Sequence, residues 1–237
     1  MKIEILGSGN GFEYNLGNTS FILWNDDESD GILMDCGYTV FGTLRDLEKS
    51  GRDVISKLST VFISHMHDDH VGSAGIFSMF RKSVLKRLNR ENETTKFIGI
   101  DIRPLFDITL KGSPGLYEYD NSESYFKLIN VYHGSEIPAC GIIINNIMYS
   151  GDTYNSLLDT DEAKNVKLII HEATLKDGPF HTLFEKLISA PKEVKEKTWL
   201  IHNSQNHLDS GFEKTAKENG FAGICKKGQI INLANNY

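Results

Sequence analysis

Six positions of the sequence, 65-HMHDDH-70, hold three histidines and two aspartates directly after an apolar run. Titratable side chains at the end of a buried strand are costly to desolvate unless they are paired or bind something. Imidazole nitrogens and carboxylate oxygens are the ligands that a borderline-soft divalent cation such as zinc prefers. The alternative interpretation is a solvated loop that happens to be rich in histidine. The density of ligands favours a metal site.

Further candidate ligands stand where other expected strands end. His133, Asp152 and His202 each follow directly on a short apolar run. Strands that deliver side chains at their ends can bring them to one edge of a sandwich, held by rigid elements. Taken singly, each has a structural alternative, because lone histidines are often core or surface residues and an aspartate before threonine is often a cap. The complete set of candidate ligands is His65, His67, Asp69, His70, His133, Asp152 and His202.

Seven donors are too many for one tetrahedral ion, and two ions that share a carboxylate would use them all. Alternate residues of an extended chain point to the same side, so His65 and His67 can bind one ion. Asp69 and His70 then lean toward a neighbouring ion. We expect two divalent ions, with zinc first and manganese or iron as alternatives. Asp68, the spare acid of this segment, is predicted to be dispensable for metal binding.

The chain resembles the metallo-β-lactamase superfamily. The motif His-x-His-x-Asp-His stands at 65–70, and His133, Asp152 and His202 follow in family order. The resemblance covers nearly the whole chain and includes 6-LGSGNG-11. It implies the α/β fold known as the αββα four-layer sandwich, with a dinuclear metal site.

The resemblance also implies how the ligands divide between the two ions. Asp152 would bridge them, and Asp35, at the end of a neighbouring strand, would orient metal-bound groups. The two ligand sets would be His65, His67 and His133 for one ion, and Asp69, His70 and His202 for the other.

Such a site suits hydrolysis without a protein nucleophile, because two adjacent cations acidify water and polarise the group under attack. His67 indicates the same chemistry, since related branches with di-iron redox chemistry commonly carry glutamate at that position. The sequence has neither a Gly-x-Ser-x-Gly elbow nor a P-loop pattern. The glycines of 7-GSGNG-11 predict a tight turn beside the site, which would let substrate approach the backbone.

The segment 166-VKLIIHEATL-175 resembles the His-Glu-Ala-Thr motif of tRNase Z and its phosphodiesterase relatives. In those enzymes the glutamate pairs with a downstream histidine that contacts the scissile phosphate or protonates the leaving group. The resemblance implies Glu172 and His181 for this pair, and a carboxylate would hold His181 protonated as a general acid. Together with Asp69 they are the predicted catalytic residues. The structural alternative is a strand end at Glu172 and a surface histidine at 181.

The substrate that these features favour is a small phosphodiester, such as a nucleotide. The net charge of −7 argues against a broad nucleic-acid surface. The short spacing from His133 to Asp152 leaves no room for the long basic arm with which tRNase Z grips tRNA, and 111-KGSPG-115 is a small substitute. A tRNA 3′-end endonuclease is therefore the less favoured alternative.

Two other function classes remain open. One is a hydrolase of thioesters, lactones or amides, with an apolar pocket lined by Phe77, Phe80 and Leu116. The other is a non-catalytic metal-binding or nucleotide-sensing protein, which the retention of all seven ligands disfavours.

Length and composition predict one domain over residues 1–237, since 40% hydrophobic residues suffice for a substantial core. No apolar run approaches the roughly 20 residues that span a bilayer, and the start of the chain lacks the features of a signal peptide. Cys36, Cys140 and Cys225 are odd in number and far apart, which fits a reducing compartment. We therefore expect a cytoplasmic protein without a membrane partner, and a homodimer stays open.

Hydrophobic periodicity and turn residues predict the elements that position these side chains. The pair Asn145 and Asn146 suits a tight hairpin turn. The expected strands are 2–6, 19–24, 31–35, 58–64, 96–100, 126–132, 141–145, 147–150, 166–171, 198–202 and 228–233. The expected helices are 41–50, 72–88, 156–164, 182–189, 190–197 and 211–219.

Overall fold

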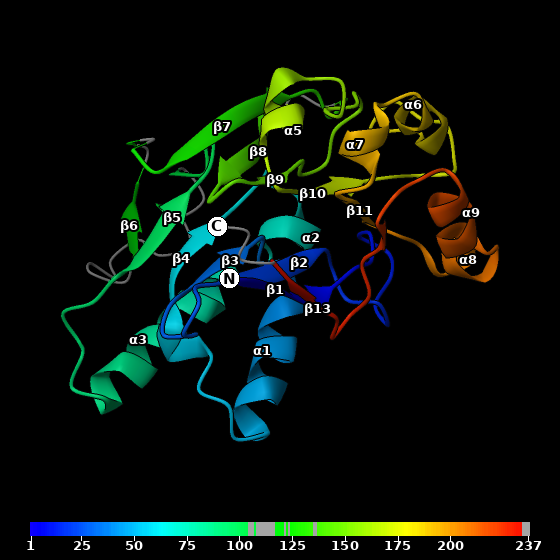
Figure 1. The fold of residues 1–237 in the computed structure, drawn as a ribbon. Helices are drawn as coiled ribbons and strands as arrows, with labels where there is room; N and C mark the ends of the chain where they lie inside the picture. The colour runs from blue at the N-terminus through cyan, green and yellow to red at the C-terminus, as the bar shows by residue number, and fades with distance from the viewer. Residues whose placement is uncertain (104–106, 108–116, 121, 123, 135–136, 234–237) are drawn as a thin grey trace.

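Two β-sheets pack face to face, with helices on both outer surfaces (Figure 1). The structure is a computed structural model that describes residues 1–103, 107, 117–120, 122, 124–134 and 137–233. The first sheet contains, in spatial order, β13 (Ile230–Asn232), β1 (Lys2–Gly7), β2 (Ser20–Trp24), β3 (Gly31–Met34), β4 (Leu58–Phe62), β5 (Thr95–Ile98) and β6 (Tyr117–Tyr119). The second sheet contains β12 (Gly223–Ile224), β11 (Thr198–Ile201), β10 (Leu168–Glu172), β9 (Ile147–Tyr149), β8 (Ala139–Ile144) and β7 (Phe126–Val131).

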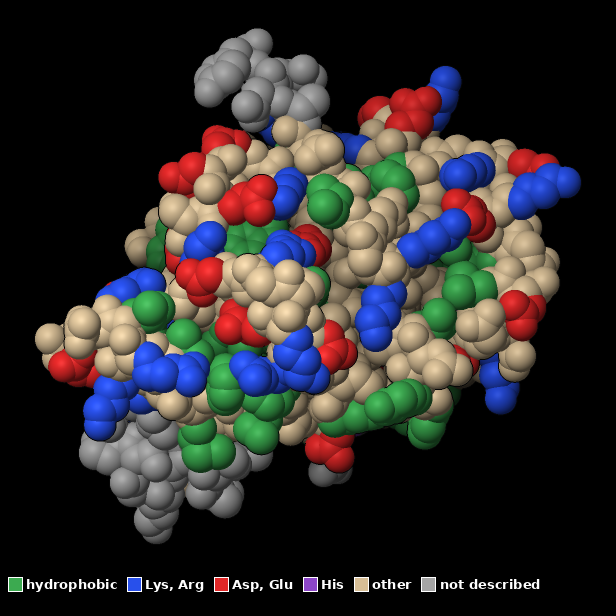
Figure 2. All heavy atoms as spheres, turned by 90° about the horizontal axis from the view of Figure 1, so that it is seen from below, with side chains coloured by type: hydrophobic (Ala, Val, Ile, Leu, Met, Phe, Trp, Pro, Cys, Tyr) green, Lys and Arg blue, Asp and Glu red, His purple; other side chains and the backbone are tan. Residues whose placement is uncertain are grey.

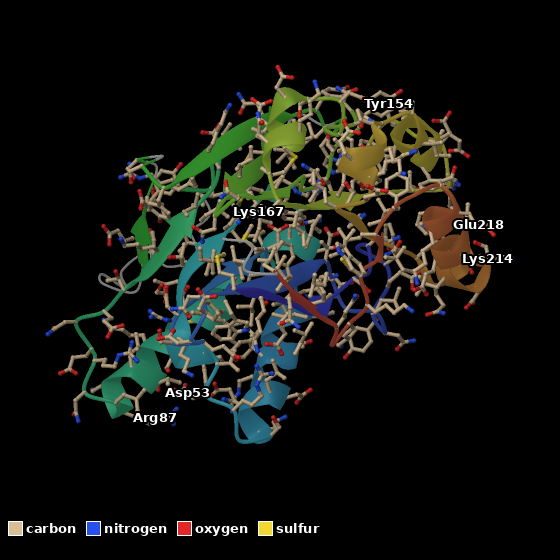
Figure 3. All side chains as sticks on the ribbon, viewed as in Figure 1. Asp53, Arg87, Tyr154, Lys167, Lys214 and Glu218 are labelled. Carbon is tan, nitrogen blue, oxygen red and sulfur yellow. The ribbon has the colours of Figure 1, made fainter. Side chains whose placement is uncertain are left out.

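Helices cover the outer face of each sheet, which completes the predicted αββα sandwich. Those on the first sheet are α1 (Val40–Lys49), α2 (Asp68–Val71) and α3 (Ala74–Arg87), with the 3-10 turn η1 (Ile55–Lys57). Those on the second sheet are α5 (Asp161–Asn165), α6 (Phe184–Ile188), α7 (Lys192–Lys195), α8 (Gln205–Asp209) and α9 (Phe212–Glu218). Charged side chains such as Arg87, Lys214 and Glu218 lie at the outer surface of these helices (Figure 3).

Each sheet is apolar on both faces, because one face packs against the other sheet and the opposite face packs against helices. In β2, Phe21 and Leu23 pack between the two sheets, whereas Ile22 and Trp24 pack under the outer helices. The ring of Phe21 meets that of Tyr149 from the other sheet edge to face, with centroids 5.2 Å apart. Burying a side chain of this size contributes about 1.5–3 kcal/mol to stability. Because neighbouring residues of β2 face two different apolar cores, the strand carries a continuous apolar run.

Parallel pairing determines where the site forms. β3 pairs in parallel with β4, and β10 pairs in parallel with both β9 and β11. Parallel strands end at the same edge of a sheet, so the residues that follow them come together. The predicted side chains that end one of these strands, or that follow it within three residues, are Asp35, His65, Asp152, Glu172 and His202.

The expected elements are present, with differences at their ends. The helix expected at 72–88 is α3, which begins at Ala74, and the single turn of α2 before it was not predicted. Helix α5 begins at Asp161 instead of 156, because the Thr160 hydroxyl caps it by accepting a hydrogen bond from the Ala163 amide. Asn145 and Asn146 form the hairpin turn, both with positive φ (52° and 61°). The short elements β6, α8 and β12 were not predicted, since so few residues show no periodicity.

Among the helices that the structure describes, none combines the length and the apolarity needed to cross a membrane.

Candidate metal centre

Three histidines form the first ligand cluster at the edge shared by the two sheets. His65 and His67 follow β4, and His133 follows β7 of the other sheet. His65 Nε2 and His67 Nδ1 lie 2.8 Å apart, and His67 Nδ1 lies 3.3 Å from His133 Nε2. His133 Nδ1 donates to the Phe180 carbonyl at 2.7 Å, which leaves Nε2 as the free ligand nitrogen.

Four side chains form the second ligand cluster. Asp69 Oδ2 lies 3.3 Å from His70 Nε2 and 3.5 Å from His202 Nε2. Asp152 Oδ2 lies 3.3 Å from each of the same two nitrogens. It also lies 3.8 Å from His133 Nε2, so this carboxylate stands between the two clusters. That position is the one a bridging ligand requires.

The donor sets fit divalent cations. His70 Nε2, His202 Nε2 and Asp152 Oδ1 are buried, and none has a hydrogen-bond partner among the described residues. Unpaired buried polar atoms are costly, and divalent cations bound at the clusters would satisfy them. Tetrahedral ligands bound at zinc–nitrogen distances stand about 3.3 Å from one another, which matches the separations in the second cluster.

The protonation states of the ligands also favour metal binding. Burial by itself would raise the pKa of Asp69, but the charge of His70 and the nearby His202 imidazole, 3.5 Å away, hold the pKa below its ordinary value. Burial lowers the pKa of His65, and the neighbouring His70 lowers it further. Asp69 therefore offers an ionised oxygen and His65 a neutral nitrogen, the forms that bind metals.

Asp35 supports the second cluster from behind. Its Oδ2 accepts hydrogen bonds from His70 Nδ1 at 2.8 Å and from the Tyr149 hydroxyl at 2.7 Å. Its Oδ1 accepts one from the Ser64 amide at 2.7 Å. Asp35 is fully buried and adopts φ of +57°, a conformation that is strained for a residue with a side chain. The geometry is that expected for a residue that orients His70.

We predict that Tyr149→Phe weakens the second ion about 10- to 100-fold, the usual effect of removing an outer hydrogen bond to a metal site. The hydroxyl reaches Asp35 from the opposite sheet, so its loss removes one of the three donors to the buried Oδ2 that orients His70. Chelator competition measures the affinity of each ion. Tyr119→Phe is the matched control, because it removes a hydroxyl bonded to the Gly99 carbonyl instead. Equal affinities in both variants would refute the role of Tyr149.

The predicted acid–base pair lies beside both clusters. His181 Nδ1 is 2.7 Å from Glu172 Oε2 and 3.7 Å from Asp152 Oδ2. The second oxygen of Glu172 accepts hydrogen bonds from the amides of Thr153 and Thr182. Glu172 is buried, whereas His181 is one-third exposed. A rigid buried carboxylate therefore holds an imidazole that solvent can reach.

Opposing effects set the pKa of this pair. Burial lowers the pKa of His181, but the hydrogen bond and charge of Glu172, with the charge of Asp152, raise it to about 9. Burial and Asp152 raise the pKa of Glu172, and its hydrogen bond to His181 opposes that rise. The two groups share a proton, and the negative charge of Glu172 favours the protonated imidazole of His181. His181 also belongs to a third group of potential metal ligands, with Asp152, Glu172 and His202.

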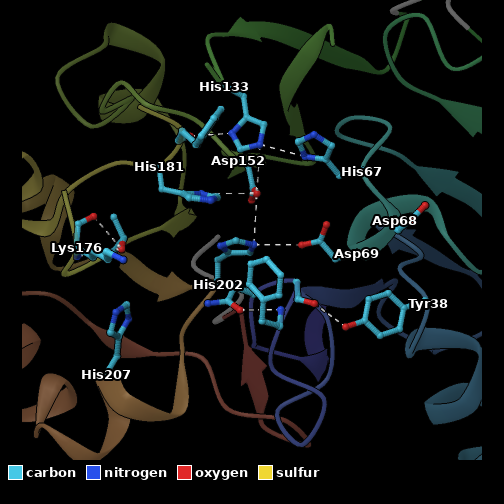
Figure 4. Close-up of a pocket in the computed structure, with 15 residues that line it drawn as sticks. Tyr38, His67, Asp68, Asp69, His133, Asp152, Lys176, His181, His202 and His207 are labelled. Carbon is cyan, nitrogen blue, oxygen red and sulfur yellow. Dashed lines mark hydrogen bonds and ion pairs between the residues drawn. The ribbon is translucent and has the colours of Figure 1, made fainter. Parts of the chain in front are cut away.

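A cavity of about 790 Å³ opens over these side chains (Figure 4). Residues of the glycine-rich turn, Asn10 and Gly11, line it as expected. Sequence reasoning did not identify the other wall residues, since isolated aromatic and polar residues carry no pattern. These are Phe12, Tyr38, Thr174, Lys176, Phe180 and His207.

At two glycines the backbone packs so closely against segments that carry or adjoin ligands that a side chain would not fit. A Cβ on Gly37 would lie 1.9 Å from the Asp69 carbonyl oxygen. Gly151 adopts φ of +57°, and its Cβ would lie 2.8 Å from the Ser64 side chain. Larger residues at either position would displace the segment carrying a ligand.

The predicted acyl pocket is wrong where the structure describes it. Phe77 is fully buried in the core under the first sheet. Phe80 packs against Phe41, with ring centroids 5.5 Å apart, and under the guanidinium of Arg45. Both point from α3 into the protein because helical spacing places them on its inner face. The third residue, Leu116, and the segment 111–115 lie outside the described residues.

Comparison with known proteins identifies relatives along most of the chain. The anti-Pycsar protein Apyc1 of Paenibacillus harenae is 27% identical over 228 residues, which cover 85% of this chain and 89% of that protein. Ribonuclease Z 1 of Schizosaccharomyces pombe is 30% identical over 244 residues, covering 85% of this chain but 30% of the larger protein.

Solved structures show the same fold. The metallo-β-lactamase fold protein YhfI from Bacillus subtilis has a TM-score of 0.75 and 21% identity, with 97% of this chain and 98% of that one covered. The short form of human tRNase Z has a TM-score of 0.69 and 18% identity, covering 98% and 99%. The chain therefore has the metallo-β-lactamase fold and is similar to its tRNase Z and phosphodiesterase branch.

The sequence also matches the model of a protein family. A family model described as "Anti-Pycsar protein Apyc1" matches residues 1–90 and 78–231. The matched residues include all the candidate ligands described above, together with Glu172 and His181. This chain belongs to the anti-Pycsar protein Apyc1 family.

Proposed function

We propose that the protein is a metal-dependent phosphodiesterase that hydrolyses a small nucleotide, with cyclic nucleotides as the leading substrate class. The observation that carries this proposal is the pair of His181 and Glu172, 2.7 Å apart, beside two clusters of metal ligands. A thioester hydrolase has little need for a protonated imidazole at this place, because a thiolate leaves without a proton. The Apyc1 relatives degrade cyclic nucleotides, which supports the same substrate class.

Two divalent ions, with zinc as the first expectation, would supply an acidified water molecule and a positive field for the phosphate oxygens. One ion would be held by His65, His67 and His133, and the other by Asp69, His70 and His202. Asp152 would contribute to both sites.

His181 is the proposed proton donor to the leaving oxygen. Its Nδ1 is bound to Glu172, so Nε2 is the nitrogen that can give up a proton. The pKa of about 9 keeps the ring charged at neutral pH. Glu172 keeps the ring in this orientation through a hydrogen bond of 2.7 Å, and it is held in turn by two backbone amides.

Size and charge favour a small substrate over tRNA. A cavity of about 790 Å³ is of the size that holds a single small ligand. The chain has a net charge of −7, and on the face seen in Figure 2 lysine and arginine side chains are interspersed with acidic ones. Binding of RNA usually relies on a basic stripe. The likeness to ribonuclease Z keeps an endonuclease as the second candidate.

A substrate panel tests the proposal. We expect the zinc- or manganese-loaded protein to hydrolyse 3′,5′-cyclic nucleotides faster than a linear dinucleotide, an acyl thioester or a precursor tRNA. The Asp69→Ala variant sets the background. Faster cleavage of the precursor tRNA would establish the endonuclease, and hydrolysis of the thioester alone would overturn the phosphodiesterase assignment.

A further inference from the structure

Phe12 is 97% exposed, although it lines the cavity over the candidate metal centre. It lies in the loop between β1 and β2, at the end of the glycine-rich turn. An apolar ring left in water beside a ligand cavity is a feature of binding sites, because the ligand supplies the burial that the fold does not.

The loop that carries Phe12 is firmly built. The Asn10 side chain accepts a hydrogen bond from the Phe12 amide at 2.9 Å, and the Asn10 amide donates to the Asn203 carbonyl at 3.0 Å. The Tyr38 hydroxyl donates to the Gly11 carbonyl at 2.6 Å (Figure 4). These bonds hold the turn as far as the Phe12 amide, so the exposure of the ring is a product of the fold and not of a loose segment.

A second aromatic ring approaches the cavity from the other sheet. Phe180 follows β10, is 43% exposed and also lines the cavity. Its carbonyl accepts the hydrogen bond from His133, and its ring centroid lies 6.0 Å from that of His133. The ring rests on Gly134, where a Cβ would lie 2.7 Å from the Phe180 Cδ1. Phe180 is thus fixed beside a metal ligand with part of its ring open.

We propose that Phe12 and Phe180 form a subsite for the nucleobase of the substrate. This inference rests on the proposed function, in which the metal centre and His181 take the phosphodiester. The phosphate end would be held at the ligand clusters, and the planar base would pack against aromatic rings supplied by the two sheets. Stacking on aromatic rings is tolerant of base identity, because every base has a π-face. The subsite therefore accepts purines and pyrimidines.

The polar residues of the cavity wall agree with this division. Lys176 is the lysine that lines the cavity, and Asn10 lines it beside Phe12. The side-chain oxygen of Asn10 is already bonded to the Phe12 amide. The polar oxygen next to Phe12 is thus already engaged by the backbone, whereas the two rings leave their faces open to a base.

Binding measured without turnover tests the subsite. We expect the wild-type protein to bind a nucleoside 5′-monophosphate at least tenfold more tightly than ribose 5-phosphate, by titration calorimetry. Phe12→Ala and Phe180→Ala should each reduce this ratio several-fold, and the double variant should abolish it. Phe12→Trp should retain it. Affinity for ribose 5-phosphate should stay within about twofold, since stacking acts on the base alone.

Tyr14→Ala is the matched control, because Tyr14 is 76% exposed on the same loop and is not among the residues that line the cavity. Equal affinity of the wild-type protein for the two ligands overturns the subsite, whether or not cyclic nucleotides are hydrolysed. A base preference without any hydrolysis supports the subsite and overturns the proposed function. If Phe12→Ala changes only the oligomeric state in light scattering, the ring is a contact between copies and the subsite is refuted.

Discussion

Asp69→Ala should lose the second metal ion and on the order of 10³-fold in kcat/KM, whereas Asp68→Ala should keep both ions and most of the activity. Asp69 Oδ2 lies 3.3 Å from His70 Nε2 and 3.5 Å from His202 Nε2, so its removal opens the second cluster. A metal ion supplies several kcal/mol of charge stabilisation, and each 1.36 kcal/mol is tenfold in rate. Metal content by mass spectrometry and steady-state kinetics measure the two effects.

Asp68 is the matched control because it is the neighbouring aspartate and carries the same charge. It is exposed, and Figure 4 shows its carboxylate turned away from Asp69. If electrostatic attraction of the ions were the main contribution of these acids, the two variants would lose metal alike. Retention of two ions per chain by Asp69→Ala would contradict the assignment of the ligands.

His181→Ala should lower kcat for a cyclic nucleotide by about 10²- to 10⁴-fold, the usual contribution of a general acid. It should lower hydrolysis of bis(p-nitrophenyl) phosphate far less, because p-nitrophenolate leaves without a proton. Both ions should remain bound. The same loss for both substrates, accompanied by loss of one ion, would show that His181 is a metal ligand with Asp152 and His202 instead.

The pH profile separates Glu172 from His181. A general acid works while protonated, so the rate falls as the pH rises through the pKa of His181, which Glu172 helps to raise to about 9. Glu172→Gln removes the negative charge and should move this alkaline limb to lower pH. His181→Ala should remove the limb altogether. An unchanged limb in Glu172→Gln would contradict the coupling that the 2.7 Å hydrogen bond implies.

Much of the candidate site followed from local sequence features. His65 and His67 point the same way because alternate residues of an extended chain do so. The ligands at strand ends were recognisable because each follows an apolar run, and runs of this kind mark strands buried on both faces. The sandwich, the two ligand clusters and the meeting of Glu172 with His181 were predicted in this way, with the help of the family resemblance.

The sequence by itself thus determined which residue types stand at the strand ends and which strands carry them, since both depend on short-range periodicity. Only the tertiary structure decided which side chains form the cavity wall and how its residues are supported. The hydroxyl of Tyr149 reaches Asp35 across the sheet interface, and the rings of Phe12 and Phe180 come from different sheets. The prediction that Phe77 lines a pocket was wrong for the same reason, because the packing of distant segments decides which face of α3 is buried. Contacts between residues far apart in the chain leave no periodic pattern, and packing of the two sheets brings them together.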